Sequence, residues 1–191
     1  MNNIAIFASG SGTNAQNIIE YFKLNKKAEV SCILSNKEDA YVLQRAKMYN
    51  IPTRIFNRKE LYETGEVLDF LTENGISWII LAGFLWLVPE NIVDKFTNRI
   101  INIHPALLPK FGGKGMYGMS VHRAVIDAKE NETGITIHYV NRKYDEGNII
   151  FQARCKVNKT DTPELLAEKV HKLEYKHYPA IIEKVIVDSG L

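Results

Sequence analysis

The chain has 191 residues, of which 46% are hydrophobic and 24% charged, an ordinary composition for a globular protein with one well-filled core. Its net charge of +2 is too small to indicate a nucleic-acid-binding surface. No apolar run approaches the roughly 20 residues of a membrane-spanning helix, and the N-terminus has no basic targeting segment. Cys32 and Cys155 lie in apolar runs without metal-ligand spacing, as buried reduced thiols do. We therefore expect a single cytoplasmic domain over residues 1–191 that binds neither nucleic acid nor membranes.

Strand-like and helix-like hydrophobic patterns alternate through the first half of the chain. Strands are expected at Ile4–Ala8, Val30–Leu34, Thr53–Phe56, Trp78–Ala82 and Arg99–Ile103. Helices are expected around residues 15–22, 42–49, 61–75 and 89–96, the third of them as one helix stopped by Gly75. Trp78–Ala82 is the most apolar run, which is typical of a central strand. The alternation predicts an α/β fold with a doubly wound, mostly parallel, Rossmann-like sheet.

The pattern changes after residue 130. Thr133–Val140 alternates like a half-buried strand, and after a polar turn Ile149–Val157 is its expected antiparallel partner. Thr162 and Pro163 suit the N-cap and first position of a long amphipathic helix. The apolar face of this helix is expected to contain Leu165, Leu166, Val170, Leu173 and Ile181. The fold should therefore end with antiparallel strands and a helix near the C-terminus.

A glycine-rich turn, Ser9–Asn14, joins the first expected strand to its helix, at the edge of the sheet where such folds bind ligands. Read with Ala15, it matches the GxGxxA form of a dinucleotide fingerprint. That interpretation also needs an acid at the end of the second strand, where this chain has Ser35-Asn36-Lys37. The turn therefore favours a single phosphate over a dinucleotide, with a purely structural glycine turn as the remaining alternative.

A second motif, Asn102–Lys110, places Asn102 and His104 two residues apart at a strand end, so that both point to one face. This stretch resembles the folate-dependent formyltransferases, and the resemblance covers nearly the whole chain. It is carried by Ser9–Asn14, Ser35–Lys37, Leu81–Phe84, Asn102–Lys110, Gly134–Val140, Asp145, and Glu174 ahead of Tyr178-Pro179. The resemblance implies a Rossmann-like α/β fold, in agreement with the hydrophobic pattern.

The resemblance implies that Asn102, His104 and Asp145 are the catalytic residues. The implied reaction transfers the formyl group of 10-formyltetrahydrofolate to the amine of N1-(5-phospho-D-ribosyl)glycinamide, a step of purine biosynthesis. Asn102 would donate a hydrogen bond to the oxyanion of the tetrahedral intermediate, and protonated His104 would assist and transfer protons. A carboxylate beside a histidine favours the protonated form, which is the role expected for Asp145.

The same resemblance implies the substrate contacts. Phosphoribosylglycinamide would be bound by Gly12, Thr13, Asn14 and Glu174. The folate would be bound by Arg58, Leu85, Trp86, Leu87, Val88, Asn102, Asn141, Arg142, Lys143, Tyr144 and Asp145. The other histidines lack ligand spacing, so no metal is expected, and His138 is expected either to line the site or to support it from the core. The expected partners are small-molecule substrates, and a homodimer is compatible with the sequence.

Three departures from the family pattern stand near the expected site. Trp86 occupies a position where the common form has arginine, and Glu146 and Asn148 replace glycine and proline around Asp145. The glycine-rich segment Phe111–Ser120 is longer than usual and is predicted to be a mobile lid. The alternatives are a formyltransferase acting on an amino sugar, an NAD-binding oxidoreductase, which lacks its acid on strand two, and a non-catalytic nucleotide-binding module.

Overall fold

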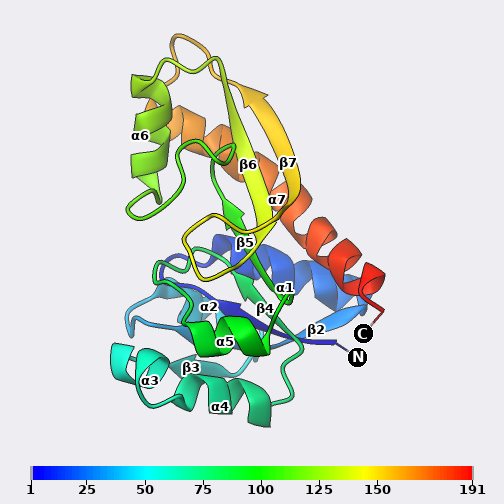
Figure 1. Cartoon of the computed structure of the whole chain (residues 1–191). Coiled ribbons are helices and arrows are strands. Elements are labelled where there is room, and N and C mark those ends of the chain that lie inside the picture. The colour runs from blue at the N-terminus through cyan, green and yellow to red at the C-terminus, as the bar shows by residue number, and fades with distance from the viewer. Residues whose placement is uncertain (1, 191) are drawn as a thin grey trace.

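The protein, described from a computed structural model over residues 2–190, has a seven-stranded sheet between two layers of helices (Figure 1). The strands are β1 (Asn2–Phe7), β2 (Ala28–Ser35), β3 (Thr53–Ile55), β4 (Trp78–Leu81), β5 (Ile100–His104), β6 (Glu132–Tyr139) and β7 (Ile149–Lys156). Their order is β3-β2-β1-β4-β5-β6-β7, parallel through β5, with β6 and β7 antiparallel to their neighbours. The predicted doubly wound sheet, its central β4 and its antiparallel end are confirmed.

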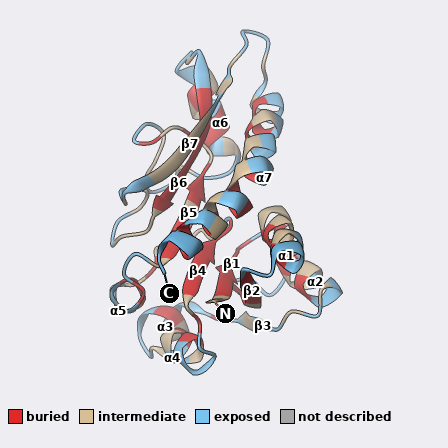
Figure 2. Ribbon diagram, turned by 90° about the vertical axis from the view of Figure 1, so that its right-hand side faces the viewer, coloured by how far each residue is buried: buried red, intermediate tan, exposed pale blue. Residues whose placement is uncertain are grey.

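The helices cover both faces of this sheet. They are α1 (Thr13–Asn25), α2 (Tyr41–Met48), α3 (Arg58–Tyr62), α4 (Glu66–Glu73), α5 (Glu90–Lys95), α6 (Met119–Asp127) and α7 (Pro163–Asp188). Ile4 and Ile6 of β1 pack toward α1, α2 and α7, whereas Ala5 and Phe7 pack toward α3, α4 and α5. Figure 2 shows the resulting buried strands in the middle of the molecule. Burial on both faces explains why these strands are continuous apolar runs rather than alternating ones.

The prediction of one helix over residues 61–75 was wrong, because the segment forms α3 and α4. Asn57 and Glu60 form a capping box at the start of α3, in which each side chain accepts a hydrogen bond from the other residue's backbone N–H. Gly65 then takes a left-handed conformation, with φ of 79°, at the start of α4. Glycine adopts this conformation readily, so it breaks the helix there.

Two further differences lie in the second half of the chain. Helix α6 was not predicted, although its buried Val121 and Val125 have the spacing of one helical face. Leu165 was expected on the apolar face of α7 but is 46% exposed, in the first turn of the helix. The cap of α7 is confirmed: the Thr162 hydroxyl accepts a hydrogen bond from the Leu165 N–H at 3.3 Å.

Cys32 is buried, Cys155 is partly exposed, and both are free thiols. Within residues 2–190, none of the helices has the length and apolar character needed to cross a bilayer.

The strand order reverses between β1 and β4, and the carboxyl ends of these strands are tied together. The Ser9 N–H donates to the Gly83 carbonyl at 3.0 Å. The Ser9 hydroxyl donates to Asn36 Oδ1 at 2.6 Å and accepts from the Leu85 N–H at 3.1 Å. Open α/β sheets bind ligands at such a reversal, so these contacts fix the rim of the expected site.

Candidate active site

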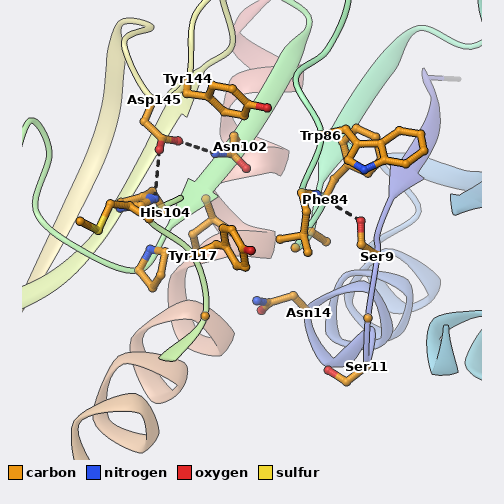
Figure 3. Close-up of a pocket in the computed structure, with 18 of the residues that line it drawn as sticks. Ser9, Ser11, Asn14, Phe84, Trp86, Asn102, His104, Tyr117, Tyr144 and Asp145 are labelled. Atoms are coloured by element: carbon orange, nitrogen blue, oxygen red, sulfur yellow. Dashed lines mark hydrogen bonds and ion pairs between the residues drawn. The ribbon is translucent and has the colours of Figure 1, made fainter. Parts of the chain in front are cut away.

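A cavity of about 690 Å³ opens at this edge of the sheet (Figure 3). The predicted site residues that line it are Gly12, Thr13, Asn14, Arg58, Leu85, Trp86, Asn102, His104, Tyr144, Asp145 and Glu174. The predicted folate-binding residues outside its lining are Leu87, Val88, Asn141, Arg142 and Lys143. The cavity thus collects residues from the first turn, the ends of β4 and β5, the β6–β7 loop and α7.

Residues of α2 hold the first turn in place, with the N-terminus of α1 facing the cavity. The Arg45 Nε donates to the Ser11 carbonyl at 2.8 Å. Gly12 has φ of 73°, and a Cβ there would lie 2.5 Å from Val42 Cγ2. The first intrahelical bond is donated by Gln16, and no side chain caps the helix. The N–H groups ahead of it therefore remain available to an anion, which the helix dipole also favours.

Asn14 and Glu174 meet beside this turn. The Asn14 Nδ2 donates to Glu174 Oε2 at 2.9 Å, and the buried Asn14 Oδ1 has no hydrogen-bond partner. Glu174 is only 6% exposed, and burial raises the pKa of its carboxyl against the opposing effects of Asn14 and His171. One turn further along α7, Tyr178 anchors the helix by donating to carbonyls of β4 and β5. A buried acceptor pair suited to hydroxyl groups is therefore held rigidly beside the anion site.

Asn102, His104 and Asp145 also meet at the cavity, as predicted for the catalytic residues. Asn102 and His104 lie on β5, and Asp145 comes from the β6–β7 loop with φ of 55°. Asp145 Oδ2 lies 3.5 Å from His104 Nδ1, and its Oδ1 lies 3.4 Å from Asn102 Nδ2. Figure 3 shows the carboxylate between the amide and the imidazole. The arrangement combines a hydrogen-bond donor, an acid–base group and a fixed negative charge.

His138 supports Asn102 from the neighbouring strand β6 and does not line the cavity. Its Nδ1 lies 2.8 Å from the Tyr139 carbonyl, so this nitrogen carries the proton in the neutral ring. Its Nε2, 3.0 Å from Asn102 Nδ2, is then the acceptor. The pair fixes the orientation of the Asn102 amide and leaves its second N–H directed toward Asp145. His138 therefore supports the site by orienting Asn102 and does not line the cavity.

The two ionisable catalytic candidates have shifted pKa values. Burial lowers the pKa of His104, although Asp145 and the Phe111 carbonyl, 2.7 Å from Nε2, both raise it. Burial raises the pKa of Asp145, but the neighbouring His138 and His104 rings and the Gly113 N–H outweigh it, so that the net pKa is lowered. Asp145 acts on His104 in the expected direction, yet burial has the larger effect. The imidazole is thus poised to accept a proton beside an ionised carboxylate.

An aromatic wall closes the other side of the cavity. The Arg58 guanidinium lies 4.7 Å from the Trp86 ring and 5.9 Å from that of Tyr62. Trp86 therefore does not supply the charge of the arginine that is usual at this position in the family. Its ring instead stacks on the Arg58 guanidinium at the same edge of the cavity. The Tyr62 hydroxyl donates to the Leu87 carbonyl, and Val88 is part of the core, which explains why neither residue 87 nor 88 reaches the cavity.

Several lining residues had no role predicted from the sequence. They include Lys37, Phe84, His122 and His171, whereas Ser9 belongs to the predicted phosphate turn, and Met116 and Tyr117 belong to the predicted lid. His122 lies just after the glycine-rich segment, where the absence of a predicted helix concealed its placement. Over the described residues, no cluster of three or more His, Cys, Asp or Glu side chains is arranged to hold a metal ion.

The fold and the site together define a Rossmann-like α/β protein with a turn suited to binding an anion and an amide–imidazole–carboxylate set suited to acyl transfer. The chain belongs to the formyl transferase family, whose profile matches residues 2–182.

Individual relatives agree with this assignment. A phosphoribosylglycinamide formyltransferase of Haemophilus influenzae is 36% identical, with 96% of this chain and 86% of that protein covered. The chloroplastic phosphoribosylglycinamide formyltransferase of Arabidopsis thaliana is 38% identical over 94% of this chain, which spans 63% of that protein's length. The crystal structure of phosphoribosylglycinamide formyltransferase from Anaplasma phagocytophilum superposes with a TM-score of 0.89 at 33% identity, covering 98% of this chain and 87% of that one.

Proposed function

We propose that this protein transfers the formyl group of 10-formyltetrahydrofolate to the amine of N1-(5-phospho-D-ribosyl)glycinamide, a step of purine biosynthesis. The observation that carries the proposal is the single cavity shared by the anion-binding turn and by Asn102, His104 and Asp145. In this proposal residues 1–191 act as one cytoplasmic formyltransferase domain on small-molecule substrates, without a metal.

The phosphorylated amine would occupy the side of the cavity nearest α1. Backbone N–H groups of Gly12, Thr13 and Asn14 would bind the phosphate, because an anion satisfies the unpaired donors at the helix start. The buried Glu174 carboxyl and the unpartnered Asn14 Oδ1 would accept hydrogen bonds from the sugar hydroxyls. This placement directs the free amine toward β5.

The amine nitrogen would attack the formyl carbon, forming the new C–N bond as the carbonyl oxygen becomes an oxyanion. The second N–H of Asn102, which is directed toward Asp145 in the free protein, would turn to that oxygen and donate to it, in a role where one donor contributes about 3–4 kcal/mol in other enzymes. His104 would accept the proton that the attacking nitrogen loses and return it to the folate nitrogen as the old C–N bond breaks. Asp145 would stabilise the intervening imidazolium, since its lowered pKa keeps it ionised.

The folate would lie along the aromatic wall. The Leu85 backbone, Trp86 and Tyr144 would contact its rings, and the stacked Arg58 would face its carboxylate tail. Asn141, Arg142 and Lys143 would act through the backbone of the loop that carries Asp145. Arg142 ties that loop to α5 by pairing with Asp94.

The principal test supplies the purified protein with both proposed substrates and follows release of tetrahydrofolate. We expect turnover, its loss in His104→Ala, and undiminished rates after chelation of metals. Turnover with a phosphorylated amino sugar but none with the glycinamide ribonucleotide would contradict the assigned acceptor. Nicotinamide-dependent oxidation is disfavoured because Asn36 and Lys37, rather than an acid, stand at the end of β2.

A further inference from the structure

His122 is a buried polar side chain in the cavity that the proposed mechanism leaves unused. It lies on α6, is 2% exposed, and lines the same cavity as the catalytic candidates. Its Nδ1 is shielded from solvent and has no hydrogen-bond partner among the described residues. An unpaired buried polar group destabilises a fold, so its presence at the wall of a ligand cavity calls for a partner that arrives with the ligand.

The charge state of His122 restricts what that partner is. Burial first, and then the charges of His171 and His104, lower the pKa of His122 to about 4. The ring is therefore neutral at neutral pH, with one nitrogen as donor and the other as acceptor. A neutral imidazole has no charge with which to hold a phosphate, whereas it matches a hydroxyl group, which both donates and accepts.

The position of His122 along the cavity identifies which hydroxyl it meets. It lies near enough to both His104 and His171 for their charges to oppose its protonation. His104 marks the reacting end, and His171 stands 4.0 Å from the Glu174 carboxylate at the sugar end. His122 thus lines the cavity together with His104, His171 and Glu174, on helix α6, which packs against α7.

We propose that His122 binds a ribose hydroxyl of the phosphorylated amine, opposite Asn14 and Glu174. The inference rests on the proposed function and adds a specificity-determining residue to it. The ribose would be contacted by side chains from α1, α6 and α7. The His122 ring would turn so that the shielded Nδ1 meets the hydroxyl, and an acceptor without that hydroxyl would leave Nδ1 unpaired. His122 would therefore select for a ribosyl rather than a deoxyribosyl acceptor.

The test compares wild type, His122→Leu and His122→Asn with the ribosyl acceptor and with its 2-deoxy and 3-deoxy analogues. Leucine should raise KM for the ribosyl acceptor roughly three- to tenfold, the effect of one lost neutral hydrogen bond. It should leave KM for the formyl donor unchanged. It should also leave KM unchanged for the deoxy analogue that lacks the hydroxyl bound by His122. Asparagine, whose amide reaches the position of Nδ1, should restore most of the affinity. His177→Leu, at a histidine outside the cavity lining, is the matched control and should change neither KM.

Thermal unfolding separates a binding role from a structural one. Since leucine removes an unpaired polar group, His122→Leu should have an equal or higher Tm without ligands while binding the acceptor more weakly. An equal loss with the ribosyl and both deoxy acceptors, or an unchanged KM in the leucine variant, would overturn the inference while the proposed function stands. If wild type fails to turn over the ribosyl acceptor, the proposed function fails and this inference with it.

Discussion

The two ends of the cavity are built in different ways. The proposed anion-binding end (the anion end) is a run of consecutive residues, Gly12 to Asn14, whose donors are backbone N–H groups at the start of α1. The reacting end combines side chains from β5 with Asp145, which is 43 residues from Asn102 in the sequence. Under the proposed function, the conformation of the chain matters most at the first end, and the chemical identity of each side chain matters most at the second end.

This difference predicts opposite sensitivities to substitution. Changes at the anion end should act through backbone geometry and should affect binding of the phosphorylated amine. Changes at the reacting end should remove chemistry and leave binding and folding nearly intact. Substitutions that failed to follow this division would show that the two ends are less independent than their construction indicates.

The largest effect is expected for Asp145→Asn. The substitution preserves shape but removes the charge that favours protonated His104, so kcat should fall by roughly 10²- to 10⁴-fold. Steady-state kinetics measures the loss, and circular dichroism with thermal unfolding should show a nearly unchanged fold. Glu146→Gln, at the exposed neighbouring residue that pairs with Lys143, is the control and should retain activity. Near-normal turnover in Asp145→Asn would remove this carboxylate from the mechanism.

The next largest effect is expected for Gly12→Ala. The new Cβ would lie 2.5 Å from Val42 Cγ2, at a residue with φ of 73°, so the turn must shift. We expect KM for the phosphorylated amine to rise about tenfold or more and the free energy of unfolding to fall by about 1–3 kcal/mol. Gly10→Ala is the matched control, because a Cβ at Gly10 meets nothing within 4 Å. A larger change in KM for the formyl donor than for the amine would contradict the assignment of this end.

The same difference explains how much of the site could be predicted from the sequence. The anion end is local: the strand, the glycines and the helix are all visible within a short stretch, so the pattern alone favoured a phosphate. Asn102 and His104 could be placed on one face by their spacing. Asp145 could not, because hydrophobic periodicity does not pair a loop with a distant strand, and only the resemblance to formyltransferases supplied it.

For the fold, the sheet was predictable because each strand buried on both faces is an unbroken apolar run. The predictions of helices were wrong where glycines interrupt an apolar helical pattern. Gly65 lies inside an apolar helical pattern and breaks it, and the glycines before residue 119 hid the short helix α6. The net pKa shift of His104 was not predictable either, because it depends on how deeply the ring is buried.

A smaller effect, on stability rather than activity, is expected from the pH dependence of His122. Its pKa is about 4 in the folded protein, against about 6.5 in an unfolded chain. Between these two pKa values the unfolded state binds more protons than the folded state. The contribution of the neutral His122 ring to the free energy of unfolding is therefore complete above pH ~6.5. It is lost as pH falls toward 4, by up to about 3 kcal/mol. Denaturant unfolding of His122→Leu should lose less stability over this range than wild type does. If the free energies of unfolding of the two proteins changed equally with pH, the lowered pKa assigned to His122 would be refuted.

The smallest effect is expected in the glycine-rich segment, which contacts the reacting end and part of which lines the cavity. Its first part is already held at the reacting end, because the Phe111 carbonyl contacts His104 and the Gly113 N–H donates to Asp145 at 2.9 Å. The part from Lys114 to Gly118 lines the cavity, and its glycines have open space around them. Hydrogen exchange should therefore show Gly113 protected without substrates, and residues 114–118 protected only when both substrates are bound. Equal protection of residues 114–118 in free and bound protein would contradict the lid, while loss of Gly113 protection in Asp145→Asn would show that the catalytic carboxylate also anchors it.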